Sequence, residues 1–254
     1  MKTIFCAVVL SAVMSAGLFR PTSEREHPAV SISVVLRAHN APQDPNSLTN
    51  YASEGVMVVP YEGSSDGKAH NFFVHRVSAL VRGGSFRYDT VDFNGSLRET
   101  YISDGTVCNR SLTGRKGLVN AERRIGEMQF KLVESRVWRF GLLPFLRRLS
   151  DPRTEATYLG RTESGNHKFE VKTPSGTWTL LSDESGLIQR LEIGKGTIIF
   201  SDYRSVEGVQ LPFNERVLID GRQFYELSFD NINLKPKLDG DLFNSSDWSE
   251  LAGR

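Results

Sequence analysis

The chain has 254 residues, of which 39% are hydrophobic and 24% are charged, and its formal net charge is +1. These proportions are ordinary for a globular protein, so they exclude a disordered chain and a fibrous repeat. The near-neutral charge gives no electrostatic basis for binding nucleic acid, and we expect no nucleic-acid partner.

The N-terminal residues have the pattern of a secretory signal peptide. Lys2 precedes an apolar run from Thr3 to Phe19 with small residues near its end, and the sequence then becomes polar in the stretch RPTSEREHP. We therefore expect residues 1–20 to be a signal peptide and residues 21–254 to form one exported domain. An uncleaved membrane anchor is the alternative, and both interpretations place the domain outside the cytoplasm.

The cysteines predict no disulfide within the exported domain. Cys6 lies inside the expected signal peptide, which leaves Cys108 alone in the rest of the chain. Cys6 also lacks the small preceding residue of a lipid-modified cysteine, so we expect no lipid anchor. Cys108 has no histidine near it in the sequence, and a buried, unreactive thiol is the favoured interpretation.

Helical patterns are confined to two regions. Residues 28–40 favour a first helix, with a further turn expected across residues 46–50. The second region covers residues 118–149, where Ile125 and Met128 begin a series of apolar residues at helical spacing. No linker or change in composition divides the chain, which indicates a single domain.

The stretch WRFGLLPFLRR, residues 138–148, places large apolar side chains beside a proline and between arginines. Gly141 and Pro144 interrupt the helical pattern, so we expect a new short helix over residues 145–149 with Pro144 in its first turn. The stretch is too short to span a bilayer. Buried core, a partner-binding patch and the wall of an apolar pocket are the interpretations that remain for it.

Most of the remaining sequence predicts antiparallel strands. Phe169 and Val171 alternate with charged residues, as in a sheet with one buried face, and Pro212 indicates an edge strand or a bulge. Glycine-containing turns recur mostly about ten residues apart and favour hairpins. We therefore expect a mainly β fold, a long curved antiparallel sheet with helices on its concave side. The turns are Asn94-Gly95, Asp104-Gly105, Gly165-Asn166, Ser175-Gly176, Ser185-Gly186, Gly194-Lys195-Gly196, Glu207-Gly208 and Asp220-Gly221.

No catalytic or metal-binding constellation survives its sequence context. Residues 63–67, GSSDG, match the G-x-S-x-G pattern of hydrolases, but they join two β-rich runs instead of a strand and a helix. The five histidines lack metal-ligand spacing, and residues 194–197 lack the upstream glycine of a phosphate-binding loop. We therefore predict a protein that is not an enzyme and needs no metal or cofactor.

Two groups of short motifs resemble one known family. The first is GSFRY at residues 84–88, followed by ETYISDGT at residues 99–106. The second runs from FSDYR at residues 200–204 to LDGDLF at residues 238–243. In order and spacing they resemble the lipoprotein-localisation (LolA/LolB-like) superfamily and exported proteins described as outer-membrane lipoprotein-sorting-like. The resemblance covers residues 29–243.

This resemblance implies an incomplete antiparallel barrel whose hollow is closed by helices and holds acyl chains. It places residues 138–148 between the two halves of the barrel, so we expect them to cover the hollow, either as a permanent plug or, as favoured here, as a lid. It leads us to expect a monomeric periplasmic binder or carrier of lipid or of an acylated lipoprotein. The candidate lining residues are Phe72, Phe86, Tyr88, Trp178, Phe200 and Tyr203 from strands, and Trp138, Phe140, Leu142, Leu143, Phe145 and Leu146 from the lid.

An alternative of the same fold is a periplasmic sensor or scaffold, similar to anti-sigma-factor regulators that resemble this superfamily. Such a protein binds a protein partner at the inner or outer membrane instead of a lipid. In that case the basic face of the lid, with Arg147 and Arg148, is the expected contact.

Overall fold

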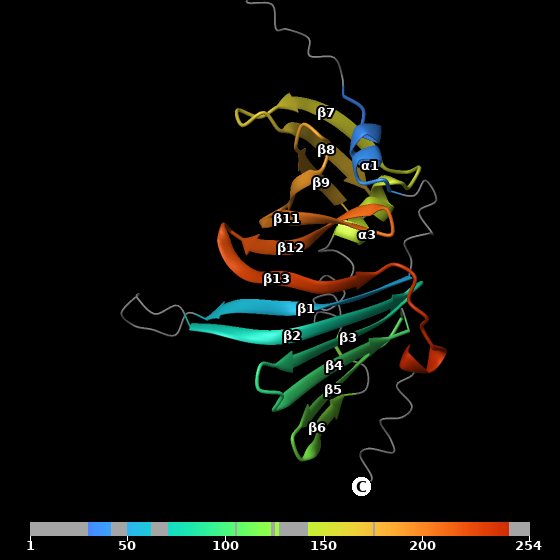
Figure 1. Cartoon of the computed structure of the whole chain (residues 1–254), viewed down its shortest axis with the longest axis vertical. Coiled ribbons are helices and arrows are strands. Elements are labelled where there is room, and N and C mark those ends of the chain that lie inside the picture. The colour runs from blue at the N-terminus through green and yellow to red at the C-terminus, as the bar shows by residue number, and fades with distance from the viewer. Residues whose placement is uncertain are drawn as a thin grey trace, which may run out of the picture.

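A computed structural model of the chain describes residues 30–41, 50–61, 71–104, 106–122, 125–126, 142–174 and 176–243. The expected signal peptide, residues 1–20, lies outside this range. Within it the chain is mainly β, with helices α1 (Ser33–Ala38) and α3 (Leu142–Leu149) and a short 3-10 helix, η3 (Gly240–Phe243) (Figure 1). The strands are β1 (Asn50–Tyr61), β2 (Asn71–Arg82), β3 (Ser85–Asp92), β4 (Leu97–Ser103), β5 (Cys108–Gly114), β6 (Gly117–Glu122), β7 (Glu155–Arg161), β8 (His167–Thr173), β9 (Gly176–Ser182), β10 (Ile188–Ile193), β11 (Gly196–Val206), β12 (Val209–Ile219) and β13 (Arg222–Asn233).

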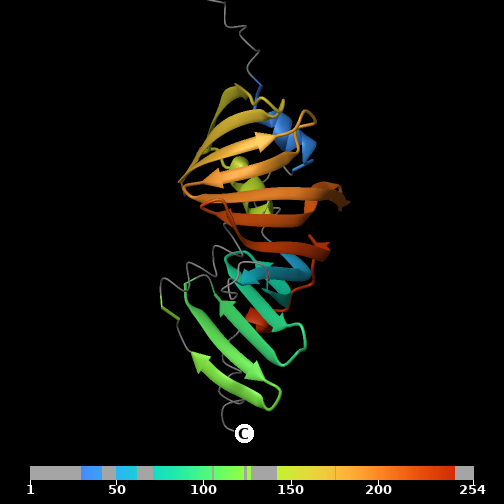
Figure 2. The same cartoon turned by 90° about the vertical axis from the view of Figure 1, so that its left-hand side faces the viewer.

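All thirteen of these strands belong to one antiparallel sheet made of two meanders. The order is β6-β5-β4-β3-β2-β1-β13-β12-β11-β10-β9-β8-β7, so the first and last described strands lie side by side at the centre. The sheet curves but does not close, because β6 and β7 lie at its opposite edges (Figures 1 and 2). The prediction of a mainly β half-barrel built on a single antiparallel sheet is confirmed.

The predicted Xaa-Gly hairpins are confirmed at the turns that flank β12. Glu207 and Gly208 have φ of 50° and 88°, and Asp220 and Gly221 have φ of 51° and 76°. Two consecutive left-handed residues match the right-handed twist of the flanking strands, and glycine adopts this conformation without steric cost. The local sequence therefore determines both hairpins.

The junction of the two meanders depends on a close backbone approach. The β1–β13 register shifts at a bulge between Glu54 and Gly55. A Cβ atom on Gly55 would lie 2.3 Å from the carbonyl oxygen of Ser228, closer than van der Waals contact permits. Only glycine at this position lets the first and last strands pair.

The two helical predictions are correct in place but wrong in extent. The first helix covers only Ser33–Ala38, and Asn50 begins strand β1; residues 46–49 lie outside the described range. The helical prediction from residue 118 is wrong, because Gly117–Glu122 pairs with β5 as strand β6. The hairpin partner that β5 offers outweighs the weak local pattern in this segment.

Helix α3 begins three residues earlier than predicted, at Leu142, and ends at Leu149 as expected. Pro144 falls in its first turn, where its missing N–H leaves no intrahelical hydrogen bond unmade. Met128, like Gly141 and the other residues between 127 and 141, lies outside the described range.

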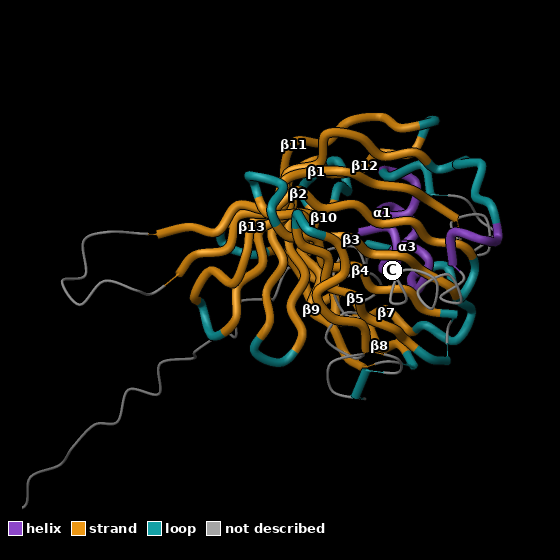
Figure 3. Tube along the Cα trace, turned by 90° about the horizontal axis from the view of Figure 1, so that it is seen from below, coloured by secondary structure: helices purple, strands orange, loops and turns teal. Residues whose placement is uncertain are grey.

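The connection from β6 to β7 contains helix α3. These strands lie at opposite edges of the sheet, and neighbouring strands are about 4.8 Å apart, so the edges are on the order of 60 Å apart along it. Helix α3 is part of this connection and contacts β8 and β12. Figures 2 and 3 show it on the concave side of the β7–β13 meander, as predicted for the covering helices. The topology therefore carries this apolar segment into the hollow.

Helix α1 packs on the same side, against the β9–β10 turn and the β11–β12 hairpin (Figure 3). A Cβ atom on Gly186 would lie 2.9 Å from the Cβ of Ala38, so the helix rests directly on the backbone of that turn. Nδ1 of the buried His39 donates to the carbonyl oxygen of Gln210 at 2.8 Å, and its Nε2 accepts the N–H of Ile188 at 3.0 Å. Burial lowers the pKa of His39 and favours the neutral ring that these two bonds require.

Candidate functional site

Strands β12 and β13 are paired only along the C-terminal half of β12 and are separate along its N-terminal half. Their ladder covers Asn214–Ile219, whereas the first part of β12, Val209–Phe213, is paired with β11. On its other side β13 continues along β1 up to Asn233. Pro212 lies in the stretch that has left the β13 ladder, so a central strand behaves locally as an edge. β12 is an inner strand of the sheet, so the predicted edge strand at Pro212 is wrong, although this residue lies outside the β13 ladder.

A cavity opens where these two strands separate. Its lining is mostly apolar and comes from both meanders and from helix α3. The cavity volume is about 60 Å³, whereas one water occupies about 30 Å³ of liquid and pockets for small ligands measure about 300–1,000 Å³. An acyl chain therefore fits only if α3 moves. The lining residues are Tyr51, Ser53, Val77, Ser78, Ala79, Tyr88, Leu142, Leu143, Leu211, Pro212, Glu215, Leu227, Phe229 and Ile232.

Helix α3 fills the rest of the hollow of the β7–β13 meander. Phe145 and Leu146 are fully buried, and the Phe145 ring lies 5.3 Å from the ring of Trp178, centroid to centroid. The guanidinium carbon of Arg148 lies 5.8 Å from the same Trp178 ring. Arg148 therefore packs its cation on an aromatic face, and only part of the predicted basic face of the lid is open to solvent.

Glu215 is the charged residue of the cavity. It occupies β12 among apolar neighbours and is 4% exposed. Burial raises its pKa to about 7, and the backbone N–H of Leu142, at the start of α3, opposes this shift by hydrogen bonding to the carboxylate. Burial, reinforced by the nearby Glu215 charge, also raises the pKa of Tyr51 and that of Tyr203. One carboxyl group thus links the cavity, the lid and two tyrosines.

The structure separates the twelve predicted lining residues into four groups. Tyr88, Leu142 and Leu143 line the cavity. Phe86, Phe145, Leu146, Trp178 and Phe200 are buried in the core that surrounds it. Tyr203 is half-buried and donates its hydroxyl to the carbonyl oxygen of Ile188, whereas Phe72 is 51% exposed and does not line the cavity. Trp138 and Phe140 lie outside the described residues.

Sequence reasoning missed most of the β1, β12 and β13 lining. Leu227 and Phe229 alternate with polar residues and were recognisable as one face of a strand, but not as the face that meets α3. Glu215 had a clearer signal, because it interrupts the apolar face formed by Leu211, Phe213 and Val217. A carboxylate on an otherwise buried strand face is costly, which marks the position.

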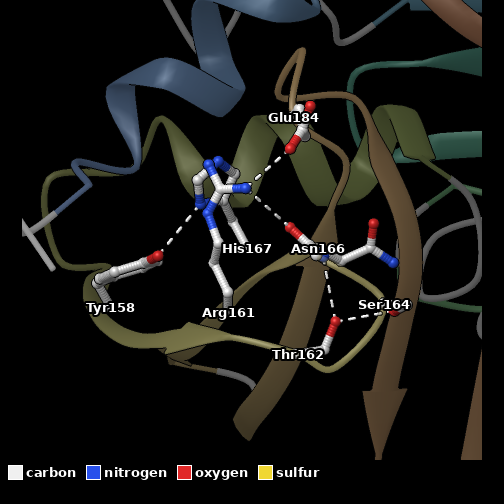
Figure 4. A network of polar contacts seen from close by, with 8 residues as sticks. Tyr158, Arg161, Thr162, Ser164, Asn166, His167 and Glu184 are labelled. Atoms are coloured by element: carbon white, nitrogen blue, oxygen red, sulfur yellow. Dashed lines mark hydrogen bonds and ion pairs between the residues drawn. The ribbon is translucent and has the colours of Figure 1, made fainter. Parts of the chain in front are cut away.

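Two other polar regions lie outside this cavity. At the β7–β8 hairpin, Tyr158 contacts Nδ1 of His167 at 3.2 Å, and Arg161 forms an ion pair with Glu184 at 2.9 Å (Figure 4). These contacts tie the hairpin to the β9–β10 turn. A broader depression of about 760 Å³ lies between α1 and the turn after α3, and it mixes polar residues such as Arg37 and Asp151 with Leu149.

The described residues contain no group of three or more His, Cys, Asp or Glu side chains that could hold a metal ion. Cys108 is buried, and burial raises the pKa of its thiol to about 12, as expected of an unreactive cysteine. Among the described helices, none has the length and hydrophobicity needed to cross a membrane.

Comparison with known proteins places this geometry in a fold group. No family model and no curated protein sequence matches the chain. The structure is similar to that of a DUF1329 family protein from Desulfovibrio piger, with a TM-score of 0.52 and 12% identity over 87% of this chain and 97% of the other. It is also similar to a LolA superfamily protein from Nitrosomonas europaea, with a TM-score of 0.53 and 10% identity over 85% and 99%. The chain therefore has a LolA-like fold, as its motifs indicated.

Proposed function

We propose that this protein binds an apolar ligand, a lipid or the acyl chains of a lipoprotein, between the sheet and helix α3. The expected setting is the periplasm, where the protein acts as a non-enzymatic carrier. The observation that carries the proposal is the apolar cavity at the point where β12 leaves β13, with α3 as one of its walls. The LolA-like fold supports the same function.

An acyl chain and helix α3 gain comparable free energies when their apolar surface enters the hollow. A palmitoyl chain gains on the order of 12 kcal/mol when it leaves water. The five large apolar side chains that α3 buries, Leu142, Leu143, Phe145, Leu146 and Leu149, gain together on the order of 10 kcal/mol at about 2 kcal/mol each. An acyl chain can therefore replace α3 in the hollow, and α3 can replace the chain when cargo leaves.

Binding of dodecanol, a neutral amphiphile, tests this proposal. We expect saturable binding at submicellar concentration in isothermal titration calorimetry, with one ligand detected by native mass spectrometry. The substitution Ala79→Phe places a ring in the cavity that Ala79 lines and should weaken binding about tenfold or more. Leu143→Trp fills the same cavity from the side of α3.

The matched control is Val119→Phe on edge strand β6. Val119 is 64% exposed and does not line the cavity, so the added ring does not enter it. This variant should bind dodecanol as the unmodified protein does. Thermal unfolding of each variant checks that the fold persists. Absence of dodecanol binding to the unmodified protein, or equal weakening by Val119→Phe, contradicts the proposal.

Binding of a protein partner is the second candidate function, and exposed aromatic rings favour it. Phe72, Phe73 and Phe93 are 51%, 52% and 77% exposed. The backbone N–H of Phe93 donates to the carbonyl oxygen of Val74, so all three residues lie at the same end of the β1–β6 meander. The basic face of α3 is the other expected contact surface for a partner. Charge reversal at the half-buried Arg147 on this face should leave dodecanol binding unchanged.

A further inference from the structure

The cavity contains one acidic side chain and, among the described lining residues, no basic one. Glu215 is the ionisable acid of the lining, and no lysine, arginine or histidine is among the described lining residues. The other polar side chains there are the hydroxyl groups of Tyr51, Ser53, Ser78 and Tyr88. The chemistry of the wall therefore distinguishes between polar head groups of different charge, although it treats their apolar chains alike.

Three aromatic side chains, those of Tyr51, Tyr88 and Phe229, line the same cavity as Glu215. Aromatic faces attract organic cations, and the attraction is stronger in a site that excludes water. A carboxylate in such a site adds a Coulomb attraction that water does not screen. An anionic head group meets the opposite situation, because burying two like charges together is strongly unfavourable.

The size of the cavity is compatible with a small cationic group. A volume of about 60 Å³ corresponds to about two water molecules, which is enough for an ammonium head next to Glu215 while the chain takes the place of α3. The N–H of Leu142 donates to the Glu215 carboxylate. When α3 moves, this bond is lost and the carboxylate can accept an ammonium N–H in its place.

We infer that the cavity selects amphiphiles with an ammonium head group over neutral and anionic ones of equal chain length, and that Glu215 is the residue that makes this selection. The inference rests on the proposed function, because it requires an apolar chain in the hollow. It adds the class of head group, which the fold alone does not indicate.

The selection should depend on pH through Glu215. The other titratable groups that face it from packed elements are Tyr51 of β1, Tyr88 of β3 and Tyr203 of β11, and α3 contributes only apolar residues to the lining. Tyr51 and Tyr203 have raised pKa values and stay neutral. The carboxyl group ionises near pH 7, so affinity for the ammonium should rise between about pH 5 and about pH 8.

Calorimetric titration with dodecylammonium, dodecanol and dodecanoate tests the inference at both pH values. We expect dodecylammonium to bind about tenfold more tightly than dodecanol at about pH 8, and dodecanoate to bind more weakly than either. Glu215→Gln keeps the shape and can still accept the Leu142 N–H, so it should abolish the preference for dodecylammonium over dodecanol and the pH dependence of that preference. Glu226→Gln is the charge-matched control on β13, because Glu226 pairs with Arg216 and does not line the cavity.

The outcomes separate the two proposals. Equal binding of the three amphiphiles to the unmodified protein, or an ammonium preference that persists in Glu215→Gln, overturns the inference but leaves the proposed function intact. A preference for dodecanoate overturns it as well. Failure of all three amphiphiles to bind overturns the proposed function and the inference with it.

Discussion

Helices α1 and α3 lie on the same concave face, but different kinds of interaction hold them there. The C-terminal end of α1 is fixed by hydrogen bonds: His39 bonds to two backbone groups, and Asn40 donates to the carbonyl oxygen of Gly208 at 3.0 Å. Helix α3 is held by large apolar side chains, with one N–H directed at Glu215. Hydrogen bonds need one partner geometry, whereas apolar contacts accept any apolar occupant.

From this difference we expect the two helices to differ in how readily a ligand displaces them. Displacing α1 leaves buried backbone groups without their hydrogen-bond partners, and a lipid chain cannot replace these hydrogen bonds. Displacing α3 exposes apolar surface of the sheet, and an acyl chain covers such surface equally well. The proposed lid role of α3 rests on this difference in how the two helices are held. The first prediction tests it on α3, and the next two test α1 and Glu215.

The largest expected effect comes from Phe145→Ala in α3. The ring is fully buried against Trp178, so its removal should lower the free energy of unfolding by about 3–5 kcal/mol. Because the lost contact is apolar, saturating dodecanol should restore part of this loss. Urea unfolding with and without dodecanol measures both quantities. The control Leu159→Ala, at a half-exposed position on β7, should show neither effect; a Phe145→Ala loss that dodecanol leaves unchanged contradicts the lid.

A smaller loss, about 2–3 kcal/mol, is expected for His39→Ala, because the buried N–H of Ile188 loses its acceptor. Dodecanol should not restore this loss. In the unmodified protein the lowered pKa of His39 means that its contribution is complete above its usual pKa of 6.5 and disappears as pH falls through the folded-state value. Urea unfolding across that range measures it. Arg37→Ala, on the exposed face of α1, is the control and should leave both the stability and its pH dependence unchanged.

The smallest effect should come from Glu215, and it has the opposite pH dependence. Its pKa is raised from 4.5 to about 7, so its stabilising contribution is complete below the lower value and is lost as pH rises through the higher one. The loss amounts to about 3 kcal/mol at most. Glu215→Gln should therefore be more stable than the unmodified protein at about pH 8 by about 1–3 kcal/mol and equal to it at about pH 4. Greater stability of the unmodified protein at alkaline pH would contradict the raised pKa.

The sequence predicted the local features of the fold well. Residue pairs such as Glu207-Gly208 and Asp220-Gly221 determine tight hairpins through their backbone conformations alone. The alternation of buried and exposed side chains along β8 and the position of Pro144 in the first turn of α3 are likewise determined by a few neighbouring residues. The motifs at residues 84–88 and 200–204 indicated the LolA-like fold that the structure has.

Long-range pairing decided what the sequence alone could not. Strand β6 formed where helix was expected, because β5 offered a hydrogen-bonding partner. Phe72 and Phe86 carry the same ring, yet Phe86 is buried and Phe72 is half-exposed, since burial depends on which strands and helices cover each position. The site at Glu215 exists only where β12 leaves β13 beneath α3. Turn and strand preferences are local properties of the chain, whereas the cavity is made by residues far apart in sequence that only the completed sheet brings together.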